Sequence, residues 1–198
     1  MNAKLKDLRK SQIMEAAQSV IVVKGYGQSR MDDIVQLSNL SKGAIYWYYN
    51  SKKDIYLSLV DHWFDEYSQG IINNLENKNT ASGQLKVLFN YFIEQFDKNP
   101  ATFKIMVEFW RMAGLDNDFN LKLQEVYSHF LDYIINIIKH GMDNGEFKKV
   151  DPRITALSIL VNIEGIHWFI LFDKSEVEAH DYIDTISDFI LNGLKNKE

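Results

Sequence analysis

The sequence predicts an all-α protein, and three observations support this fold class. Apolar residues recur at three- and four-residue steps along most of the 198-residue chain, as they do on one face of an amphipathic helix. The only two prolines, Pro100 and Pro152, stand at positions where a new helix can begin. Alternating β-branched runs, which would predict strands, are few. We therefore expect nine helices.

Residues 1–25 predict the first helix, which starts with a basic cluster and continues with an apolar face. Gly25 and Gly27 are expected to end it, because glycine is common just beyond the last helical residue. The basic cluster fits a solvated terminus and a contact with DNA phosphates about equally well. Its members are Lys4, Lys6, Arg9 and Lys10.

Residues 29–54 contain two short helical patterns and the start of a longer one. Ser29 is a good N-cap with an acid, Asp32, three residues later, so the first short helix is expected to start there. Residues 38–40 interrupt the pattern, and Ser41 is expected to cap a second helix over residues 42–48. Two short helices joined by a tight turn form a helix-turn-helix, whose second helix enters the major groove of DNA.

The second short helix has features that a small core helix does not need. Lys42 lies in the first turn, where the helix dipole disfavours a cation, and this favours an anionic partner. Tyr46, Trp47 and Tyr48 point in different directions around the helix, so some aromatic surface must be exposed. The alternative is a capped core helix with one stacked aromatic, which the basic flanks make less favoured.

The order and spacing of several short motifs resemble those of the TetR family of bacterial repressors. The motifs are IMEAA at 13–17, GY at 25–26, SKGAIY at 41–46 and KKD at 52–54, and they cover roughly the first quarter of the chain. The resemblance implies an N-terminal helix-turn-helix domain and a larger helical domain that binds a ligand. By the same resemblance, DNA contacts fall on Ser41, Lys42, Gly43, Tyr46, Trp47 and Lys52.

Three positions depart from the family's pattern. Arg30 replaces a hydroxyl residue at the start of the first short helix, Ala44 replaces a common threonine, and Tyr48 followed by Tyr49 replaces His-Phe. The first and third departures can change phosphate contacts and the operator that is read. Arg30, Ala44 and Tyr48 are therefore kept among the DNA-binding candidates, and no operator sequence is carried over.

Six longer helices are expected after this region. The first, over residues 52–75, would connect the DNA-binding part to the rest and end in a polar, turn-rich stretch at 77–83. The others are expected at 84–98, 100–113, 117–142, 152–172 and 178–195.

Residues 152–172 are apolar nearly all round. A membrane span is one explanation, but the run is short for a bilayer and carries Asn162, Glu164 and His167. A helix buried on all sides in a soluble assembly fits better, and one chain has little left to cover both of its sides. The TetR resemblance also implies a homodimer formed through the last two helices. It divides the chain into a DNA-binding domain at 1–51 and a ligand-binding and dimerisation domain at 52–198.

Composition sets further limits. The formal net charge is −5, yet residues 1–57 carry nine lysines and arginines against five acids, whereas the remainder carries 13 against 22. A basic module on an acidic body can direct its field to one end of the protein, as DNA binding requires. The absence of cysteine excludes disulfides and thiolate metal sites and fits a cytoplasmic location. The N-terminus lacks the apolar run of a secretory signal.

The sequence contains no recognisable catalytic, cofactor-binding or metal-binding motif, so we do not expect an enzyme. It favours a DNA-binding transcriptional regulator. The specific expectation is a repressor that a small apolar or aromatic molecule releases from a palindromic double-stranded operator. The competing class is a helical small-molecule carrier or sensor that never binds DNA.

The resemblance places the ligand pocket among the middle helices of the C-terminal part. Glu108 has Lys104 and Arg111 at helical spacing, so a surface ion pair explains it. Glu164 differs, because His167 is the only polar residue within a helical turn of it. Glu164 can form a structural pair with His167, accept a hydrogen bond across a dimer, or meet a polar or cationic group of a ligand. The ligand-binding candidates are Phe103, Met106, Trp110, Phe130, Glu164, His167 and Trp168.

Overall fold

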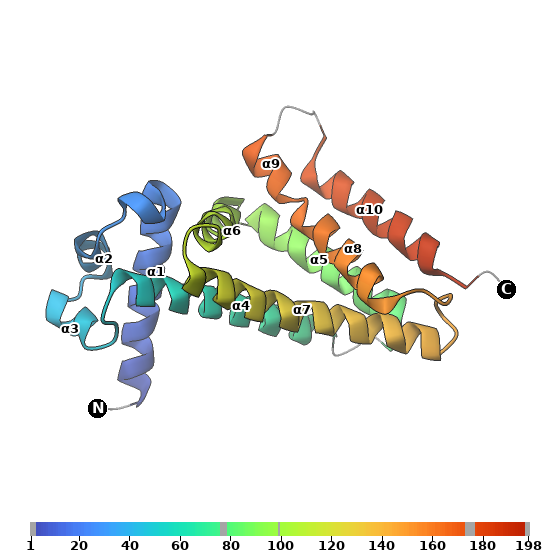
Figure 1. Ribbon diagram of the computed structural model, residues 1–198, viewed down its shortest axis with the longest axis horizontal. Coiled ribbons are helices and arrows are strands. Elements are labelled where there is room, and N and C mark those ends of the chain that lie inside the picture. Colours follow the sequence, from blue (N-terminus) through green and yellow to red (C-terminus); the bar gives the residue numbers. More distant parts are fainter. Residues whose placement is uncertain (1–2, 76–78, 99, 173–176, 197–198) are drawn as a thin grey trace. The chain divides into compact units, whose positions relative to one another are not determined.

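The computed structural model describes residues 3–75, 79–98, 100–172 and 177–196, and helices make up most of these ranges (Figure 1). Within them, the strand-like pairing is limited to an isolated antiparallel bridge between Phe147 and Lys195. The predicted all-α class is confirmed. The helices are α1 (Ala3–Gln28), α2 (Met31–Ser38), α3 (Lys42–Tyr46), α4 (Lys52–Leu75), α5 (Ala81–Lys98), α6 (Pro100–Ala113), α7 (Asn117–Asp143), α8 (Pro152–Glu164), α9 (His167–Leu171) and α10 (Ala179–Leu194).

The chain forms two compact units. The first unit comprises Met1–Glu66 and Lys104–Gln124, and the second comprises Tyr67–Phe103 and Glu125–Glu198. The predicted division between residues 51 and 52 concerns which part binds DNA and which binds ligand, and it stays a prediction.

The first unit has a core built on α1, which packs against α2. Ile13 and Ala17 of α1, Ile34 of α2 and Ile45 of α3 are completely buried. Because Ile45 points into this core, the opposite side of the short helix α3 faces outward.

α1 contains a sharp break at Gly25, where the backbone has φ 67° and ψ 169°. This conformation is essentially restricted to glycine, because a side chain would clash with the backbone. A Cβ at this position would also lie only 3.2 Å from the carboxylate of Glu108 on α6. The sequence predicted the end of the helix here, and the structure instead gives one more turn after the break.

The start of α2 corrects one prediction. The N-cap is Arg30 rather than Ser29, and its backbone N–H donates to Asp33 Oδ2 at 2.8 Å. Ser29 is buried, and its hydroxyl donates back to the carbonyl of Tyr26. The capping pair is therefore Arg30 and Asp33, one residue later than the predicted pair of Ser29 and Asp32. Asp32 lies on the surface and has no capping role.

The second unit packs α5 and α8 against α10 (Figure 1). α5 begins at Ala81, three residues before the expected start. A residue distant in the sequence explains this earlier start. The carboxylate of Glu146 accepts the N–H groups of Ala81 at 2.7 Å and Ser82 at 2.8 Å. These two donors belong to the first turn of α5 and have no partner within the helix.

The segment that contains Glu146 also holds the end of α10. Lys148 donates its backbone N–H to the carbonyl of Leu194 at 2.9 Å, and Asn196 donates to the carbonyl of Glu146 at 3.1 Å. Phe147 is buried between these bonds. Three consecutive residues, 146–148, thus connect the start of α5 with the end of α10.

The helix expected over 152–172 is interrupted into α8 and α9 at Gly165. A Cβ on Gly165 would lie 2.7 Å from the hydroxyl oxygen of Tyr182 on α10, so this close approach requires glycine. With α8 and α9 counted as the one expected helix, the described ranges contain the nine helices that the sequence predicts. Pro152–Leu171 has the length and composition of a helix able to cross a membrane, a property shared by core helices of soluble proteins.

Candidate functional site

The predicted recognition helix, α3, presents most of its side chains to the outside. The hydroxyl of Ser41 accepts the N–H of Ala44 at 3.2 Å, which caps the helix as predicted. Asn39 makes the preceding turn with a positive φ of 56°. Tyr46 is 44% exposed and Trp47 is 64% exposed. Large exposed aromatic side chains in a helix that is otherwise anchored in a core indicate a binding surface.

Around these aromatics lie the other residues that the sequence nominated for DNA contact. Lys42 and Gly43 are exposed, Ala44 and Tyr48 are partly buried, and Arg30 is exposed at the start of α2. The ring of Tyr48 contacts the ring of Trp47 edge-to-face, with centroids 4.7 Å apart. The structure thus brings the α3 candidates to one short helix, and their contact with DNA stays a prediction.

Lys42 already has a partner within the chain. Its ammonium donates to Asp32 Oδ1 at 2.7 Å, between the first turn of α3 and the first turn of α2. This hydrogen bond raises the pKa of Lys42 above its usual value. The sequence did not suggest this pair, because Asp32 was assigned to capping.

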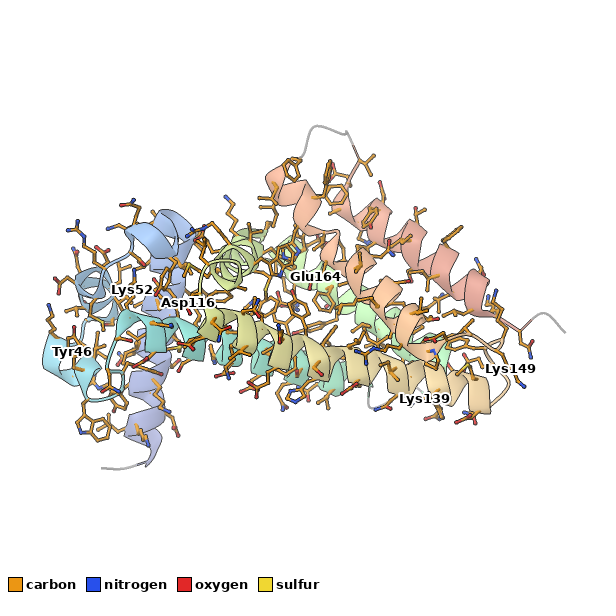
Figure 2. The ribbon with its side chains drawn as sticks, viewed as in Figure 1. Tyr46, Lys52, Asp116, Lys139, Lys149 and Glu164 are labelled. Carbon is orange, nitrogen blue, oxygen red and sulfur yellow. The ribbon has the colours of Figure 1, made fainter. Side chains whose placement is uncertain are left out.

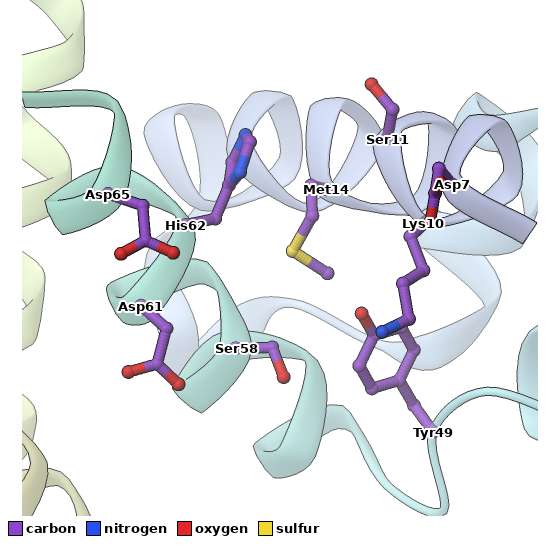
Figure 3. Close-up of a pocket in the computed structure, with 9 residues that line it drawn as sticks. All are labelled: Asp7, Lys10, Ser11, Met14, Tyr49, Ser58, Asp61, His62 and Asp65. Atoms are coloured by element: carbon purple, nitrogen blue, oxygen red, sulfur yellow. The ribbon is translucent and has the colours of Figure 1, made fainter. Parts of the chain in front are cut away.

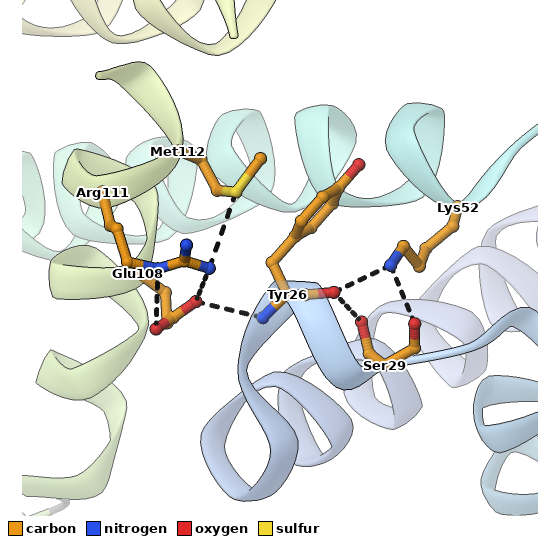
Figure 4. Close-up of polar contacts among 6 residues, drawn as sticks. All are labelled: Tyr26, Ser29, Lys52, Glu108, Arg111 and Met112. Carbon is orange, nitrogen blue, oxygen red and sulfur yellow. Dashed lines mark hydrogen bonds and ion pairs between the residues drawn. The ribbon is translucent and has the colours of Figure 1, made fainter. Parts of the chain in front are cut away.

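Lys52 has a structural role that the sequence did not reveal (Figure 4). Its ammonium donates to the carbonyl of Tyr26 at 2.7 Å and to that of Ser29 at 2.8 Å, and it lies 4.2 Å from the centre of the Tyr26 ring. Burial lowers the pKa of Lys52, opposed by the nearby charge of Asp33. Two of its three hydrogens are therefore used within the chain, which leaves one for the predicted contact with DNA.

α6 contacts the same turn of the first unit through Glu108. The Glu108 carboxylate accepts the backbone N–H of Tyr26 at 3.0 Å and pairs with Arg111, whose Nη2 lies 3.0 Å from Glu108 Oε2 (Figure 4). Burial raises the pKa of Glu108, but the hydrogen bonds from Arg111 and Tyr26 outweigh it and lower the pKa overall. The predicted ion pair with Arg111 is thus present, and the carboxylate also fixes the break in α1.

The predicted ligand-binding residues do not all belong to one unit. Met106 and Trp110 fall in the first unit, whereas Phe103, Phe130 and Glu164 fall in the second. His167 and Trp168 are also in the second unit. Their common ligand site stays a prediction.

An aromatic cluster forms the interior of the second unit near Phe103. The ring centroid of Phe103 lies 6.3 Å from that of Tyr67 and 5.5 Å from that of His167. Tyr67 lies in turn 5.5 Å from Phe92, and Phe92 lies 5.7 Å from Phe130. Phe103, Phe130 and His167 are thus connected through Tyr67 and Phe92, which the sequence did not nominate.

Glu164 lies at the end of α8, at the edge of this aromatic cluster (Figure 2). Its Oε1 accepts the hydroxyl of Tyr127 at 3.0 Å, and its Oε2 lies 3.1 Å from Nδ1 of His167. Nδ1 of His167 lies closer still to the backbone carbonyl oxygen of Glu164, at 2.8 Å, so the pair between the carboxylate and His167 that the sequence allowed stays a prediction. Tyr127 is an addition that sequence spacing could not show, because it comes from α7.

Trp168 does not fit its predicted place as a pocket wall. Its side chain is 58% exposed, and its ring contacts that of Phe172 with centroids 4.6 Å apart. Within one chain, this correction moves Trp168 from the interior to an exposed apolar surface.

A cavity of about 360 Å³ lies in the first unit between α1 and α4, and none of the predicted ligand residues lines it (Figure 3). Met14 and Tyr49 line it, and Lys10 extends towards Tyr49 (Figure 3). Asp61 and Asp65 lie along its α4 side. Over the described residues, no group of three histidines, cysteines or acids is arranged to hold a metal ion.

Comparison with known proteins agrees with this architecture. Residues 13–59 match the family of bacterial regulatory proteins, tetR family, and residues 85–195 match the C-terminal region of BetI-type transcriptional repressors. The uncharacterized HTH-type transcriptional regulator YfiR of Bacillus subtilis (strain 168) is 24% identical over 199 residues, which cover 98% of this chain and 95% of that protein.

Two solved structures share the fold. FadR from Bacillus subtilis, in complex with stearoyl-CoA, superposes with a TM-score of 0.82 at 21% identity, over 93% of this chain and 98% of that one. AibR, in complex with isovaleryl coenzyme A and operator DNA, gives a TM-score of 0.72 at 15% identity, over 91% of this chain and 97% of that one. Together with the two family matches, these findings show that the chain belongs to the TetR family of bacterial DNA-binding transcriptional regulators.

Proposed function

We propose that this chain forms a cytoplasmic homodimeric repressor, which binds a palindromic operator through α3 and leaves it when a small ligand binds. One observation carries the dimer, and through it the palindrome. α8 buries one apolar face in its own unit and exposes another, which continues onto α9 and α10. The exposed members of this apolar face are Ile154, Leu157, Val161, Trp168, Leu171 and Phe189.

An exposed apolar surface of this kind marks an interface in a soluble protein. A second copy of the chain can cover it with the same surface, since two-fold interfaces are self-complementary. Two copies related in this way present two α3 helices, and the DNA sequence that both contact is then an inverted repeat. The proposal assigns no catalytic role to the chain.

Selection of bound duplexes from random DNA tests this part of the proposal. Two inverted half-sites are expected, with about one helical turn between their centres or a multiple of that spacing. Binding should weaken steeply as salt rises, because several phosphates are contacted. Recovery of a single asymmetric site by a protein that sediments as a monomer would contradict the proposal. The carrier alternative predicts no enrichment and almost no salt-dependent binding.

For the ligand, the support is the carboxylate of Glu164 beside the aromatic cluster of the second unit. A carboxylate next to aromatic faces suits a ligand that is mostly apolar and bears a cation or a hydrogen-bond donor. The hydroxyl of Tyr127 donates to the carboxylate and orients it. FadR was solved with stearoyl-CoA and AibR with isovaleryl coenzyme A, so proteins of this fold bind ligands that combine an apolar acyl group with a polar part.

Thermal shift with two probes tests this ligand class. Benzyltrimethylammonium is expected to raise the melting temperature of the wild-type protein and to have a smaller effect on Glu164→Gln, which lacks the charge. Glu94→Gln is the matched control, because Glu94 is exposed on α5 of the same unit. A response to stearoyl-CoA alone, equal in all three proteins, would assign Glu164 to structure and favour an acyl ligand.

A further inference from the structure

The Asp32–Lys42 ion pair places an acid beside the predicted recognition helix. Both side chains are well exposed, with 72% of the Asp32 side chain and 55% of the Lys42 side chain accessible, and their atoms lie 2.7 Å apart. Exposed ion pairs contribute little to folding stability. Capping of α2 does not need Asp32 either, because Asp33 accepts the N–H of Arg30. The first turn of α2 favours an acid at this position through the helix dipole, but that effect does not need the pairing with Lys42.

A carboxylate near a DNA-binding surface has a clear electrostatic effect. Its charge opposes the approach of phosphates, and its hydrogen bond occupies the ammonium that would otherwise pair with one of them. A lysine whose charge is already balanced within the protein also contributes less to the release of counterions from DNA. Both effects weaken binding that depends on phosphates alone, which is the basis of binding to unrelated sequences.

We propose that Asp32 is a specificity-determining residue, which lowers binding to non-operator DNA by holding Lys42 away from the phosphates. At the operator, the additional contacts of the recognition helix stabilise a complex in which Lys42 exchanges Asp32 for a phosphate. At other sequences these contacts are missing, and Lys42 stays with Asp32. The inference rests on the proposed DNA-binding role of α3, and it concerns only how non-operator sequences are disfavoured.

Binding of Asp32→Asn to a random-sequence 20-base-pair duplex tests the proposal. Asparagine keeps the size of the side chain and removes its charge. The affinity for random duplex should rise about five-fold for each α3 helix engaged, the effect of one unit charge about 4 Å away in water. The slope of log affinity against log salt should steepen by about 0.9 for each Lys42 that gains a phosphate. Affinity for the selected operator should change less, so the ratio of specific to non-specific affinity should fall.

Two further variants make the result specific to the ion pair. In a Lys42→Gln background, Asp32→Asn should raise the affinity for random duplex less than it does in the wild type, because only the direct repulsion between the carboxylate and the phosphates is then removed and no ammonium is released. Glu66→Gln removes the same charge from an exposed position on α4 and should leave both affinities near wild type. An equal gain from Asp32→Asn with and without Lys42 would overturn the proposal, as would an equal gain from Glu66→Gln.

Failure of this inference differs from failure of the DNA-binding role of α3. If α3 does not contact DNA, Lys42→Gln alone binds the selected operator as tightly as wild type. If α3 contacts DNA but Asp32 does not act on specificity, Lys42→Gln weakens operator binding while Asp32→Asn leaves binding to random duplex unchanged.

Discussion

Replacement of Lys52 by methionine should destabilise the protein by about 2–4 kcal/mol. Methionine preserves most of the aliphatic stem and removes the ammonium. Hydrogen bonds from a charged donor contribute roughly 1.5–3 kcal/mol each, and a cation over an aromatic ring adds about 0.5–1 kcal/mol. The loss is smaller than the full sum, because the carbonyl of Tyr26 keeps the hydroxyl of Ser29 as a second donor. The carbonyl of Ser29 loses its ammonium partner.

Urea unfolding followed by tryptophan fluorescence measures this change, with both proteins at the same concentration because a dimer's stability depends on it. Lys139→Met on α7 is the control, since Lys139 is exposed and its replacement should stay within about 0.5 kcal/mol of wild type. Salt titration of operator binding in the same variants separates the two roles of Lys52. A purely structural lysine leaves the salt slope unchanged when the remaining protein is folded.

The opposite result would refute this reasoning. If Lys52→Met is as stable as Lys139→Met and the salt slope falls by about 0.9 per subunit, the ammonium serves DNA and not the turn after α1. If Lys52→Met lowers both the free energy of unfolding and the salt slope, Lys52 stabilises the turn after α1 and also contacts DNA, with its third hydrogen on a phosphate.

Three other changes give independent checks. Gly25→Ala should destabilise the protein by about 1–3 kcal/mol in urea unfolding, because its φ is positive, whereas Gly193→Ala, which meets no atom within 4 Å, should be neutral or stabilising. Glu108→Gln should reduce the loss of stability in acid. The lowered pKa of Glu108 contributes stability that is present above the unfolded-state value of about 4.3 and is lost as the pH falls through the folded-state pKa, so unfolding curves collected across that range should depend less on pH in the variant. Phe189→Asp should yield a folded monomer by sedimentation and circular dichroism, because Phe189 is 75% exposed in one chain, while Leu115→Asp, also exposed but in the first unit, should leave the dimer intact.

The helices could be predicted from the sequence because their causes are local. Apolar spacing, Ser41 as a cap and Pro152 at a helix start all act within a few residues. Two of the differences arose where a distant residue changed the result. Glu146 supplies a cap that moves the start of α5, and the hydroxyl of Tyr182 accompanies the break at Gly165. Apolar periodicity contains no information about either contact.

The candidate sites also show this difference between local patterns, which the sequence contains, and contacts between distant residues, which it does not. Residues on α3 could be nominated together because they are consecutive in the chain. The partners of Lys52, Asp32 and Glu164 could not, since each pair joins different helices. For Glu164, the sequence identified the unusual carboxylate and one possible partner, His167. It could not identify Tyr127, which lies 37 residues away.

The segment at residues 146–148 has a consequence for association. Its hydrogen bonds fix the end of α10 and the start of α5 within one chain. The apolar face on α8 and α10 is consequently ordered before a second copy arrives. Association then loses less conformational entropy than it would if α10 had to be ordered on binding, and a preformed surface gives tighter binding for the same buried area. In this way, residues 146–148 can set the protein concentration at which the proposed dimer forms.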